Sequence, residues 1–327
     1  MIRIVIEEEL KKIAKLDLDM VAAIEEGFSR LDKGDATVPP IMMIPVPEKE
    51  GEVDVKSAYI KGIDHLAIKV ASGFFDNKNL GLPSQSGQIL VMSAITGFLK
   101  AVFLDNGFLT QVRTGAAGAI AAKYLAPLKA ENVGVIGAGV QARFQVEALK
   151  LVRDFNTVRM FCLDSEEEKD RYLADIKSAI GVDVIKCNSA QEVVENSSIV
   201  VTTTPSRKGF IMPEWLHPGL HITAMGCDTE EKQELNAAVL PKADILACDL
   251  KSQCERLGEL RSGYEQETIN LATPVTELGE LVNGKKSGRT DDSQITICDL
   301  TGVGIQDTMI AIKVLEIAES LDIGVKL

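Results

Sequence analysis

The sequence predicts an α/β protein in which a parallel-sheet domain is inserted into an α+β domain. From residue 131 onward, short apolar runs alternate with segments of helical spacing: NVGVIG, TVRMFCLD, VDVIKC, SIVVTTT, HITAMG, ADILACDL and QITICDL. Alternation of this kind is typical of a parallel sheet covered by helices. The residues before it have a different pattern, and one amphipathic segment, IQDTMIAIKVLEIAESL, follows Gly304 without further strand signals.

The first part of the chain predicts mixed secondary structure. IRIVI has the pattern of a strand, and LDLDMVAAIEEGFSRLDKG is apolar at helical intervals until Gly34. The runs SAYI, LAIKV, GQILVMSA and KAVFLDNG are separated by Gly, Pro and Asn, which favours antiparallel strands, while the Pro-rich TVPPIMMIPVP predicts an extended loop. We expect three segments: a first domain over 1–125, the parallel-sheet domain over 126–304, and a C-terminal helix over 305–327 that returns to the first domain.

Composition and charge exclude several classes of function. The chain has 327 residues, of which 46% are hydrophobic and 25% charged, as in soluble globular proteins. A net charge of −13 argues against binding to nucleic acid or to an anionic membrane, because both need basic surface. No apolar run approaches the ~20 residues that span a bilayer, and MIRIVIEEELKKIAKL lacks the apolar core of a signal peptide. We therefore expect a cytoplasmic protein.

Cysteine and histidine give no metal-binding pattern. The six cysteines are scattered without a CxxC pair, which favours buried, reduced thiols. None of the three histidines pairs with a cysteine at a ligand interval, so no metal is predicted. His217 and His221 enclose the turn HPGLH, for which a structural role is the simpler interpretation.

The most informative motif is Gly137-Ala138-Gly139-Val140-Gln141-Ala142, which follows an apolar run and precedes a helical segment. This order is that of a dinucleotide-binding turn in a Rossmann-like domain. Gly137 permits the tight turn, and Gly139 allows the backbone to approach a pyrophosphate, which the helix N-terminus attracts. An ordinary strand-to-helix turn is the alternative, because glycines close such turns as well.

A second nucleotide signal lies at the end of the next strand, where an acidic residue binds the adenosine ribose in such domains. TVRMFCLD offers Asp164, whose carboxylate would repel a 2′-phosphate, so NAD is favoured over NADP. Cys162, however, holds the position where many such strands place their acid, and Asp164 has an alternative role as the cap of the helix that begins in SEEEKD.

Three further residues have the chemistry of a site. Lys69 lies in the apolar run HLAIKVASGF, and Arg113 lies in the small-residue segment LTQVRTGAAGAIAAKYLA. Taken alone, each is more often a solvated cation that buries only its stem. Asp228 follows HITAMG at the carboxyl end of a predicted strand, where α/β sheets bind ligands, so it is a candidate acid or base. A helix N-cap is an equally weighted alternative, because acidic residues follow it.

These residues carry a family resemblance over nearly the whole chain. The segments LGLPSQSGQILVMSAITGFLKAVFLDNGFLTQVRTGAAGAIAAKYLA, VIGAGVQARFQ, TTTPSRKGF, PGLHITAMGCDTEEKQEL, ELGELVNGKKSGR and ITICDLTGVGIQD resemble the ornithine cyclodeaminase/μ-crystallin family in order and spacing. The stretches PPIMMIPVPEKEGEVDVKSAYIKG and IKVASGFFDN most resemble its ectoine-utilisation branch, which contains cyclodeaminases.

The resemblance implies roles for individual residues. The carboxylate-binding lysine of the family falls on Lys69, the RT-motif arginine on Arg113, the catalytic aspartate on Asp228, and the acidic residue near the reacting amine on Asp54. Nucleotide contacts fall on Thr114, Gly137, Gly139, Val140, Gln141, Asp164 and Thr203. NAD as cofactor and a homodimer formed through the non-Rossmann domain are likewise implied.

One departure bears on the substrate. Ornithine-specific members have an arginine where this chain reads PPIMMIP, and Lys56 stands here where they have an uncharged residue. Asp54 and Lys56 share one face of an extended strand. Lys56 therefore has two interpretations: an ion pair with Asp54, or a contact to a second substrate carboxylate, as in iminosuccinate.

The implied chemistry is hydride transfer at the Cα–N bond of a small amino acid, through an imine. In a cyclodeaminase the substrate's distal amine attacks that imine, ammonia leaves, and the returned hydride restores NAD. In an imine reductase or amino-acid dehydrogenase the reaction stops after one transfer. A nucleotide-binding protein without turnover, as in crystallins, is the alternative from another class.

Overall fold

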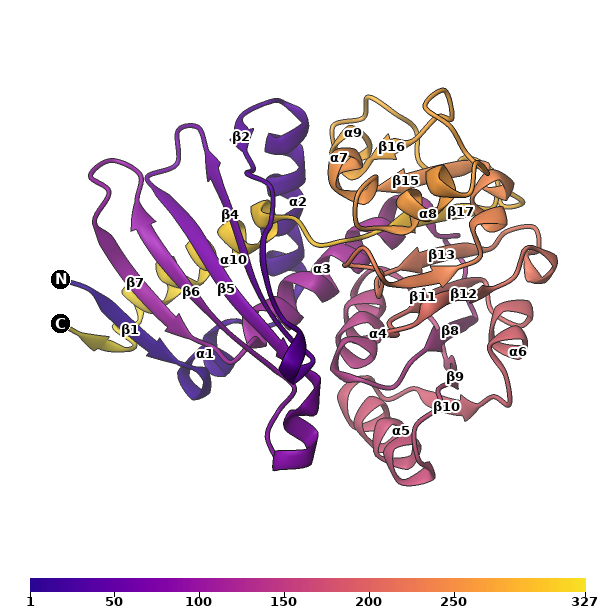
Figure 1. The fold of residues 1–327 in the computed structure, drawn as a ribbon, viewed down its shortest axis with the longest axis horizontal. Coiled ribbons are helices and arrows are strands. Elements are labelled where there is room, and N and C mark those ends of the chain that lie inside the picture. Colours follow the sequence, from indigo (N-terminus) through magenta and orange to yellow (C-terminus); the bar gives the residue numbers. More distant parts are fainter. The chain divides into compact units, whose positions relative to one another are not determined.

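The computed structural model describes residues 1–327, apart from the side chains of Phe75 and Lys78. Its internal contacts divide the chain into two compact units, and the chain crosses between them twice (Figure 1). Unit 1 comprises Met1–Arg113 and Val303–Leu327, and unit 2 comprises Thr114–Gly302. The first crossing falls within helix α3 (Phe108–Leu125) rather than at its end, where we placed the domain boundary. The second half of α3 packs in unit 2, where Gln145 donates to the Thr114 carbonyl at 2.8 Å.

Unit 1 is a sheet covered by helices. Its strands, in the order β18-β1-β7-β6-β5-β4-β2 with β3 against β4, are antiparallel except for the pair β1 and β7. The strands are β1 (Arg3–Ile6), β2 (Ala36–Thr37), β3 (Met42–Val46), β4 (Gly51–Ile60), β5 (His65–Phe74), β6 (Gln85–Ser93), β7 (Leu99–Leu104) and β18 (Val325–Lys326). The helices are α1 (Glu7–Ile13), α2 (Leu18–Asp32) and α10 (Gly304–Ser320), with short 3-10 turns η1 (Pro47–Lys49) and η2 (Phe75–Leu80).

Local chemistry accounts for the first of these elements. The Asp17 carboxylate caps α2 by accepting from the Met20 N–H at 2.9 Å, and Gly34, at φ 73°, follows the end of the helix as predicted. The extended loop predicted for TVPPIMMIPVP is wrong in part, because residues Met42–Val46 form β3. This strand pairs only with β4, so Pro45 stands in an edge strand, where a missing N–H is tolerated.

Helix α10 returns to unit 1, where it runs behind the strands in Figure 1. Its first turn lies on β4: Thr308 donates to the Ala58 carbonyl at 3.0 Å, and a Cβ on Gly304 would stand 2.3 Å from the Ser57 carbonyl oxygen. Its end leads into β18, which pairs with β1, so the two chain termini lie side by side. The C-terminal helix therefore completes the fold of the N-terminal part.

Unit 2 contains the predicted parallel sheet, in the order β10-β9-β8-β11-β13-β17-β15-β16. Its strands are β8 (Asn132–Ile136), β9 (Thr157–Phe161), β10 (Asp183–Lys186), β11 (Ile199–Thr202), β13 (His221–Ala224), β15 (Ile245–Cys248), β16 (Thr276–Glu277) and β17 (Thr296–Asp299), and a separate parallel pair comprises β12 (Arg207–Ile211) and β14 (Gln233–Leu235). The helices are α4 (Val140–Val152), α5 (Glu166–Ile180), α6 (Ala190–Glu195), α7 (Lys251–Cys254), α8 (Glu259–Glu265) and α9 (Leu278–Val282), with 3-10 turns η3 (Pro213–Trp215) and η4 (Ala237–Lys242).

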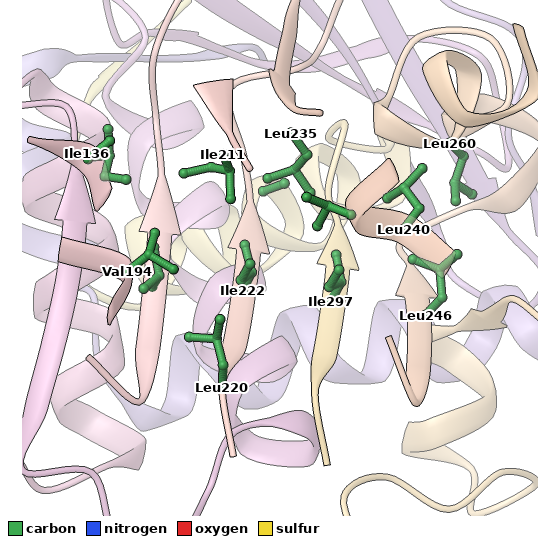
Figure 2. Close-up of a cluster of buried hydrophobic side chains, with 14 of the residues drawn as sticks. Ile136, Val194, Ile211, Leu220, Ile222, Leu235, Leu240, Leu246, Leu260 and Ile297 are labelled. Carbon is green, nitrogen blue, oxygen red and sulfur yellow. The ribbon is translucent and has the colours of Figure 1, made fainter. Parts of the chain in front are cut away.

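Two apolar layers hold this sheet. On one face Ile222, Ile297 and Leu246 lie opposite one another on β13, β17 and β15 (Figure 2). The layer around them also contains Ile136, Val194, Ile211, Leu220, Leu235, Leu240 and Leu260. The second layer packs α4 and α5 against β8 and β9 and includes Val146, Phe155, Met160 and Tyr172. Burial on both faces explains why these strands are continuous apolar runs in the sequence.

The remaining predictions about residue chemistry can be checked directly. All six cysteines are buried and unpaired, as predicted. His221 is fully buried between the Thr296 and Thr223 hydroxyls, and burial lowers its pKa to about 3, so it is a neutral structural residue. Among the described residues, no helix combines the length and the apolar character needed to cross a bilayer.

The contact between α10 and β4 predicts the effect of a single methyl group. Gly304→Ala should lower the free energy of unfolding by about 1–3 kcal/mol, because the new Cβ would overlap the Ser57 peptide group, which is backbone and cannot turn away. Urea denaturation measures this. Gly139→Ala is the matched control, since no heavy atom lies within 4 Å of its added Cβ. Equal midpoints for the two variants would contradict the close contact.

Candidate active site

The glycine-rich turn after β8 has the geometry that a dinucleotide needs. Gly137 adopts φ 113°, and its added Cβ would stand 2.6 Å from the Thr203 hydroxyl, so only glycine fits there. Gly139 is the N-cap of α4 but supplies no side-chain cap, and the space where its Cβ would project is open within 4 Å. The N–H groups of the first turn of α4 are thus left for an anion, and the open space admits a pyrophosphate.

Arg143, in the first turn of α4, braces this turn. Its Nη1 donates to the carbonyls of Ala138 and Gly139, and its Nε pairs with Asp175 at 2.7 Å. The guanidinium also lies 5.1 Å from the ring centre of Tyr172. The carbonyl groups of the turn are therefore engaged inside the protein. We did not identify Arg143 from the sequence, although it follows the glycine motif directly.

The sheet order places the turn at a topological switch point. From β8 the chain proceeds outward through β9 and β10, and then returns to β11 on the other side of β8. Thr203 follows β11 and donates to the Ile136 carbonyl, so it lies beside Gly137. Ligands of open α/β sheets bind in the crevice at such a point, at the carboxyl ends of the strands.

The acidic residue predicted for the ribose lies at the same edge. Asp164 is exposed beyond β9, whereas the Cys162 thiol is buried, and burial raises its pKa. The alternative role for Asp164 as a helix cap is wrong, because Ser165 caps α5 by accepting from the Glu168 N–H. The neighbouring lysines of this region, Lys169 and Lys186, are both ion-paired with Glu166.

Asp228 lies in the loop between β13 and β14, and no helix follows it, so the N-cap interpretation is wrong. Its carboxylate pairs with the Lys232 ammonium at 2.6 Å, and 47% of the side chain is exposed. Glu234, which sequence reasoning missed, anchors this loop. Its buried carboxylate accepts from the Gly226 N–H at 2.8 Å, and also from the Thr204 N–H and the Thr202 hydroxyl, so it ties the loops after β11 and β13 together.

Unit 1 gathers the predicted cations around one carboxylate. Asp307 Oδ1, in the first turn of α10, lies 3.1 Å from Lys69 Nζ and 3.0 Å from Arg113 Nε. Arg113 Nη1 donates to Gln306 Oε1 at 3.3 Å. Lys56 lies directly opposite Lys69 in the register of β4 and β5. Lys69, Arg113 and Lys56 are all buried, which rules out the interpretation of Lys69 and Arg113 as solvated cations.

Burial and charge decide the protonation of this cluster. Burial, together with the charges of Arg113 and Lys56, lowers the pKa of Lys69 to about 7, against the attraction of Asp307. Although burial alone would raise the pKa of Asp307, the charges of Lys69, Arg113 and Lys56 hold it below its usual value. Asp307 is therefore an anion, and Lys69 titrates near neutrality.

The remaining predicted residues divide between the units. Asp54, half-buried, shares the face of β4 that carries Lys56. Thr114 is buried in α3 beside Arg113, while Val140 and Gln141 begin α4 in unit 2. Sequence reasoning missed Asp307 and Gln306, although an acidic residue in the first turn of a helix as apolar as α10 is a signal that could have found them.

The match to known proteins covers the chain from end to end. The model of the ornithine cyclodeaminase/mu-crystallin family matches residues 3–321. The chain belongs to this family. An uncharacterized cyclodeaminase of Sinorhizobium fredii is 43% identical over 98% of this chain and 97% of its own, and an alanine dehydrogenase of Archaeoglobus fulgidus is 35% identical over 99% and 97%.

Solved structures are similar over the same length. The Δ1-pyrroline-2-carboxylate reductase of Thermococcus litoralis, in complex with NADH and L-proline, has a TM-score of 0.94 at 28% identity, covering 99% of this chain and 100% of its own. An archaeal alanine dehydrogenase dimer with bound NAD gives 0.91 at 34%, covering 99% and 98%, and the iminosuccinate reductase of Paracoccus denitrificans with NAD⁺ gives 0.90 at 29%, covering 100% and 99%. The protein is thus an NAD(P)-dependent enzyme of this family.

The exposed Asp164 carboxylate predicts the choice of cofactor. NADH should bind roughly tenfold more tightly than NADPH, because a 2′-phosphate near this carboxylate would meet like charge while the nearby lysines are already paired. Fluorescence titration with each cofactor measures this. Gly139→Ala should weaken both cofactors alike, which identifies the turn as the binding site. Equal or tighter binding of NADPH would refute the preference.

Proposed function

We propose that the protein uses NAD(H) to interconvert a small amino acid and its imine by hydride transfer at the Cα–N bond. The observation that carries this proposal is the buried pair of Lys69 and Arg113, both in contact with Asp307. Two buried cations with unused donors are suited to an α-carboxylate, which accepts hydrogen bonds from both. The dinucleotide turn of unit 2 supports the same reaction class.

Each residue has a distinct role in this proposal. Lys69 and Arg113 hold the substrate carboxylate, and so fix the direction of the Cα–H bond. Asp228 exchanges a proton at the substrate nitrogen, with Lys232 keeping its carboxylate in place. Thr203, Gly137 and Gly139 hold the dinucleotide at the switch point, with Thr114, Val140 and Gln141 as further contacts and Asp164 at the ribose. When bound, the nicotinamide accepts or supplies the hydride.

Two outcomes of this chemistry have separate support. An amino-acid dehydrogenase or imine reductase is favoured by the solved structures at 28–34% identity, all of which are reductases or dehydrogenases. A cyclodeaminase is favoured by the relative at 43% identity. Ornithine itself fits less well, because PPIMMIP lacks the arginine of ornithine-specific members.

A substrate screen decides between the outcomes. L-Alanine, L-proline, L-aspartate and L-ornithine are tested with NAD, and the corresponding imines with NADH, while absorbance of the reduced cofactor is followed. Stoichiometric change identifies a dehydrogenase or reductase. Ammonia release with catalytic NAD identifies a cyclodeaminase. Activity confined to L-aspartate would assign Lys56 to a second carboxylate. No turnover of any carboxylate-bearing amine or imine would refute the proposal.

We call Lys69 and Arg113 the clamp, because both are proposed to hold the substrate carboxylate. A positive charge alone should not be sufficient for this role at position 113. Arg113→Lys keeps the positive charge but loses the planar guanidinium, which can donate two parallel hydrogen bonds to a carboxylate. The value of kcat/KM should therefore fall roughly 10- to 100-fold. This corresponds to about 1.5–3 kcal/mol, the contribution of one charge-assisted hydrogen bond. Affinity for NADH should change far less. Arg171→Lys, on the exposed surface of α5, is the control. If Arg113→Lys matched the parent on every substrate, Arg113 would not hold the carboxylate.

We further propose that the protein is a homodimer formed through unit 1. The side chains of Lys69, Ala67 and Ile89 point to the face of the sheet that α10 covers, and they are buried. The alternate residues of the same strands point to the other face, which is apolar and only half-buried: Val55, Ile68, Val70, Leu90 and Val102. Apolar surface of this extent is typical of an interface between subunits.

A charge placed on that face tests the dimer. Ile68→Glu should convert a dimeric parent into a folded monomer, because an unpaired carboxylate would be buried at the interface. Size-exclusion chromatography with light scattering gives the mass, and circular dichroism reports folding. Leu271→Glu, at an exposed apolar residue of unit 2, should leave the mass unchanged. A monomeric parent, or a dimeric Ile68→Glu, would exclude this interface.

A further inference from the structure

Lys69 and Arg113 use only some of their N–H donors in contacts within the protein. A single oxygen, Asp307 Oδ1, accepts from Lys69 Nζ and from Arg113 Nε, and Gln306 accepts from Arg113 Nη1. A guanidinium and an ammonium each have several N–H donors, so Arg113 and Lys69 have more donors than these contacts use. Asp307 and Gln306 thus engage Nε and Nη1 of the guanidinium, and we expect the remaining N–H donors to bind a carboxylate.

The turn that carries Asp307 is itself held firmly. Gln306 Oε1 also accepts from the Val303 N–H at 2.7 Å, which closes the start of α10. Thr308 ties the same turn to the Ala58 carbonyl, and Gly304 lies against the Ser57 peptide without room for a side chain. The position of the Asp307 carboxylate is therefore set by contacts of the same turn on both sides of it.

The positive charges of Lys56, Lys69 and Arg113 require a carboxylate nearby, and Asp307 supplies it. Lys56 and Lys69 stand directly opposite each other on neighbouring antiparallel strands, where like charges repel. Asp105 is a second buried acid near Lys69, but its carboxylate accepts from the Leu109 N–H at 2.8 Å at the start of α3. Asp307 is the carboxylate in contact with both Lys69 and Arg113.

We propose that Asp307 is the positioning residue of the substrate-carboxylate clamp: it sets the spacing and direction of Lys69 and Arg113 without touching substrate. This inference rests on the proposed function, because it assigns Asp307 a part in holding the same α-carboxylate. It also identifies the substrate class further. With Nε and Nη1 of Arg113 engaged by Asp307 and Gln306, the clamp accepts one carboxylate on the remaining donors of Arg113 and Lys69.

The charged groups that face Lys69 determine in which direction each of them shifts the pKa of this amine, and that direction can be measured. They are Lys56 on β4, Arg113 on α3, Asp307 on α10 and Asp105 at the end of β7. Lys56 and Arg113 lower the pKa of Lys69, while Asp307 raises it, and the balance with burial is about 7. Since the protonated amine binds the carboxylate, kcat/KM should fall as the pH rises through this value.

Two neutralising variants should therefore shift the pH profile in opposite directions. Asp307→Asn removes the attraction, so the basic limb of kcat/KM should move down by about one pH unit or more, and KM should rise at least about tenfold. Lys56→Met removes a repulsion, so the basic limb should move up. The proposal would be overturned if Asp307→Asn had the KM of the parent and the same basic limb of kcat/KM. It would also be overturned if the basic limb moved in the same direction in both variants.

A third variant separates position from charge. Asp307→Glu keeps the anion but displaces its oxygens by one methylene, so the basic limb should stay closer to the parent than in Asp307→Asn while KM still rises. The NADH dissociation constant and the thermal midpoint of each variant exclude general damage. If Asp307→Asn fails to fold, Asp307→Glu and Lys56→Met still test the assignment. Parent KM in Asp307→Glu would show that the carboxylate supplies charge without positioning, which would overturn the proposal.

A measurement without substrate distinguishes the failure of this inference from that of the proposed function. In protein labelled with ¹³C-lysine, the Cε resonance of Lys69, assigned by its absence in Lys69→Arg, reports the titration of this amine directly. If the screen finds no substrate, the proposed function fails. A Lys69 resonance that titrates at lower pH in Asp307→Asn than in the parent would still support the contact between Asp307 and Lys69. A Lys69 titration that is identical in parent and Asp307→Asn would overturn the inference whatever the substrate.

Discussion

The contact of Asp307 with Lys69 and Arg113 is the constraint on which unit 1 depends. Lys69 and Arg113 are buried cations that share this carboxylate, and a buried charge without a partner costs far more than the packing gained nearby. Helix α10 must therefore dock with its first turn over β4 and β5. This explains why α10 packs closely on β4, with Gly304 against the Ser57 peptide. It also explains why α10 belongs to unit 1, although unit 2 directly precedes it in the sequence.

A second buried carboxylate organises unit 2 by a different means. Glu234 accepts hydrogen bonds from backbone N–H groups and threonine hydroxyls at the end of β11 and in the loops after β11 and β13. Burial raises its pKa, while these four donors act in the opposite direction. Thr203 and Asp228 belong to those two loops, so residues with proposed roles at the nucleotide and at the proton are both placed through one side chain. In each unit, a fully buried acid contacts groups with proposed roles in the reaction or lies in the loops that carry them.

The sequence predicted those parts of the molecule that depend on local patterns. Apolar runs of strand length identified β8, β9, β10, β11, β13, β15 and β17, and the spacing of Gly137 and Gly139 identified the turn, because periodicity and backbone freedom are encoded within a few residues. The short strands β12, β14 and β16 were not predicted. Partners that meet across the fold left no such pattern: Asp307 contacts Lys69 from a helix far along the chain, and Glu234 resembled one more charge in an acidic stretch. The edge strand β3 was missed because Pro45 and its exposed methionines resemble a loop unless its pairing with β4 is known. The residue pattern identified Lys69, Arg113 and Asp228 as candidates and the family resemblance implied their roles, but neither identified Asp307 and Gln306, which contact Arg113.

The pKa of Lys69 links carboxylate binding to protonation. At about 7 in the free protein, this amine is only partly charged at neutral pH, because burial and two neighbouring cations oppose the single attraction of Asp307. A carboxylate bound at the clamp adds a second attraction and so favours the protonated form, and by reciprocity protonation favours the carboxylate. Above pH 7, binding should therefore take up a proton. A bound carboxylate therefore favours the fully protonated cluster, so cations that are costly to bury are the ones that bind the ligand.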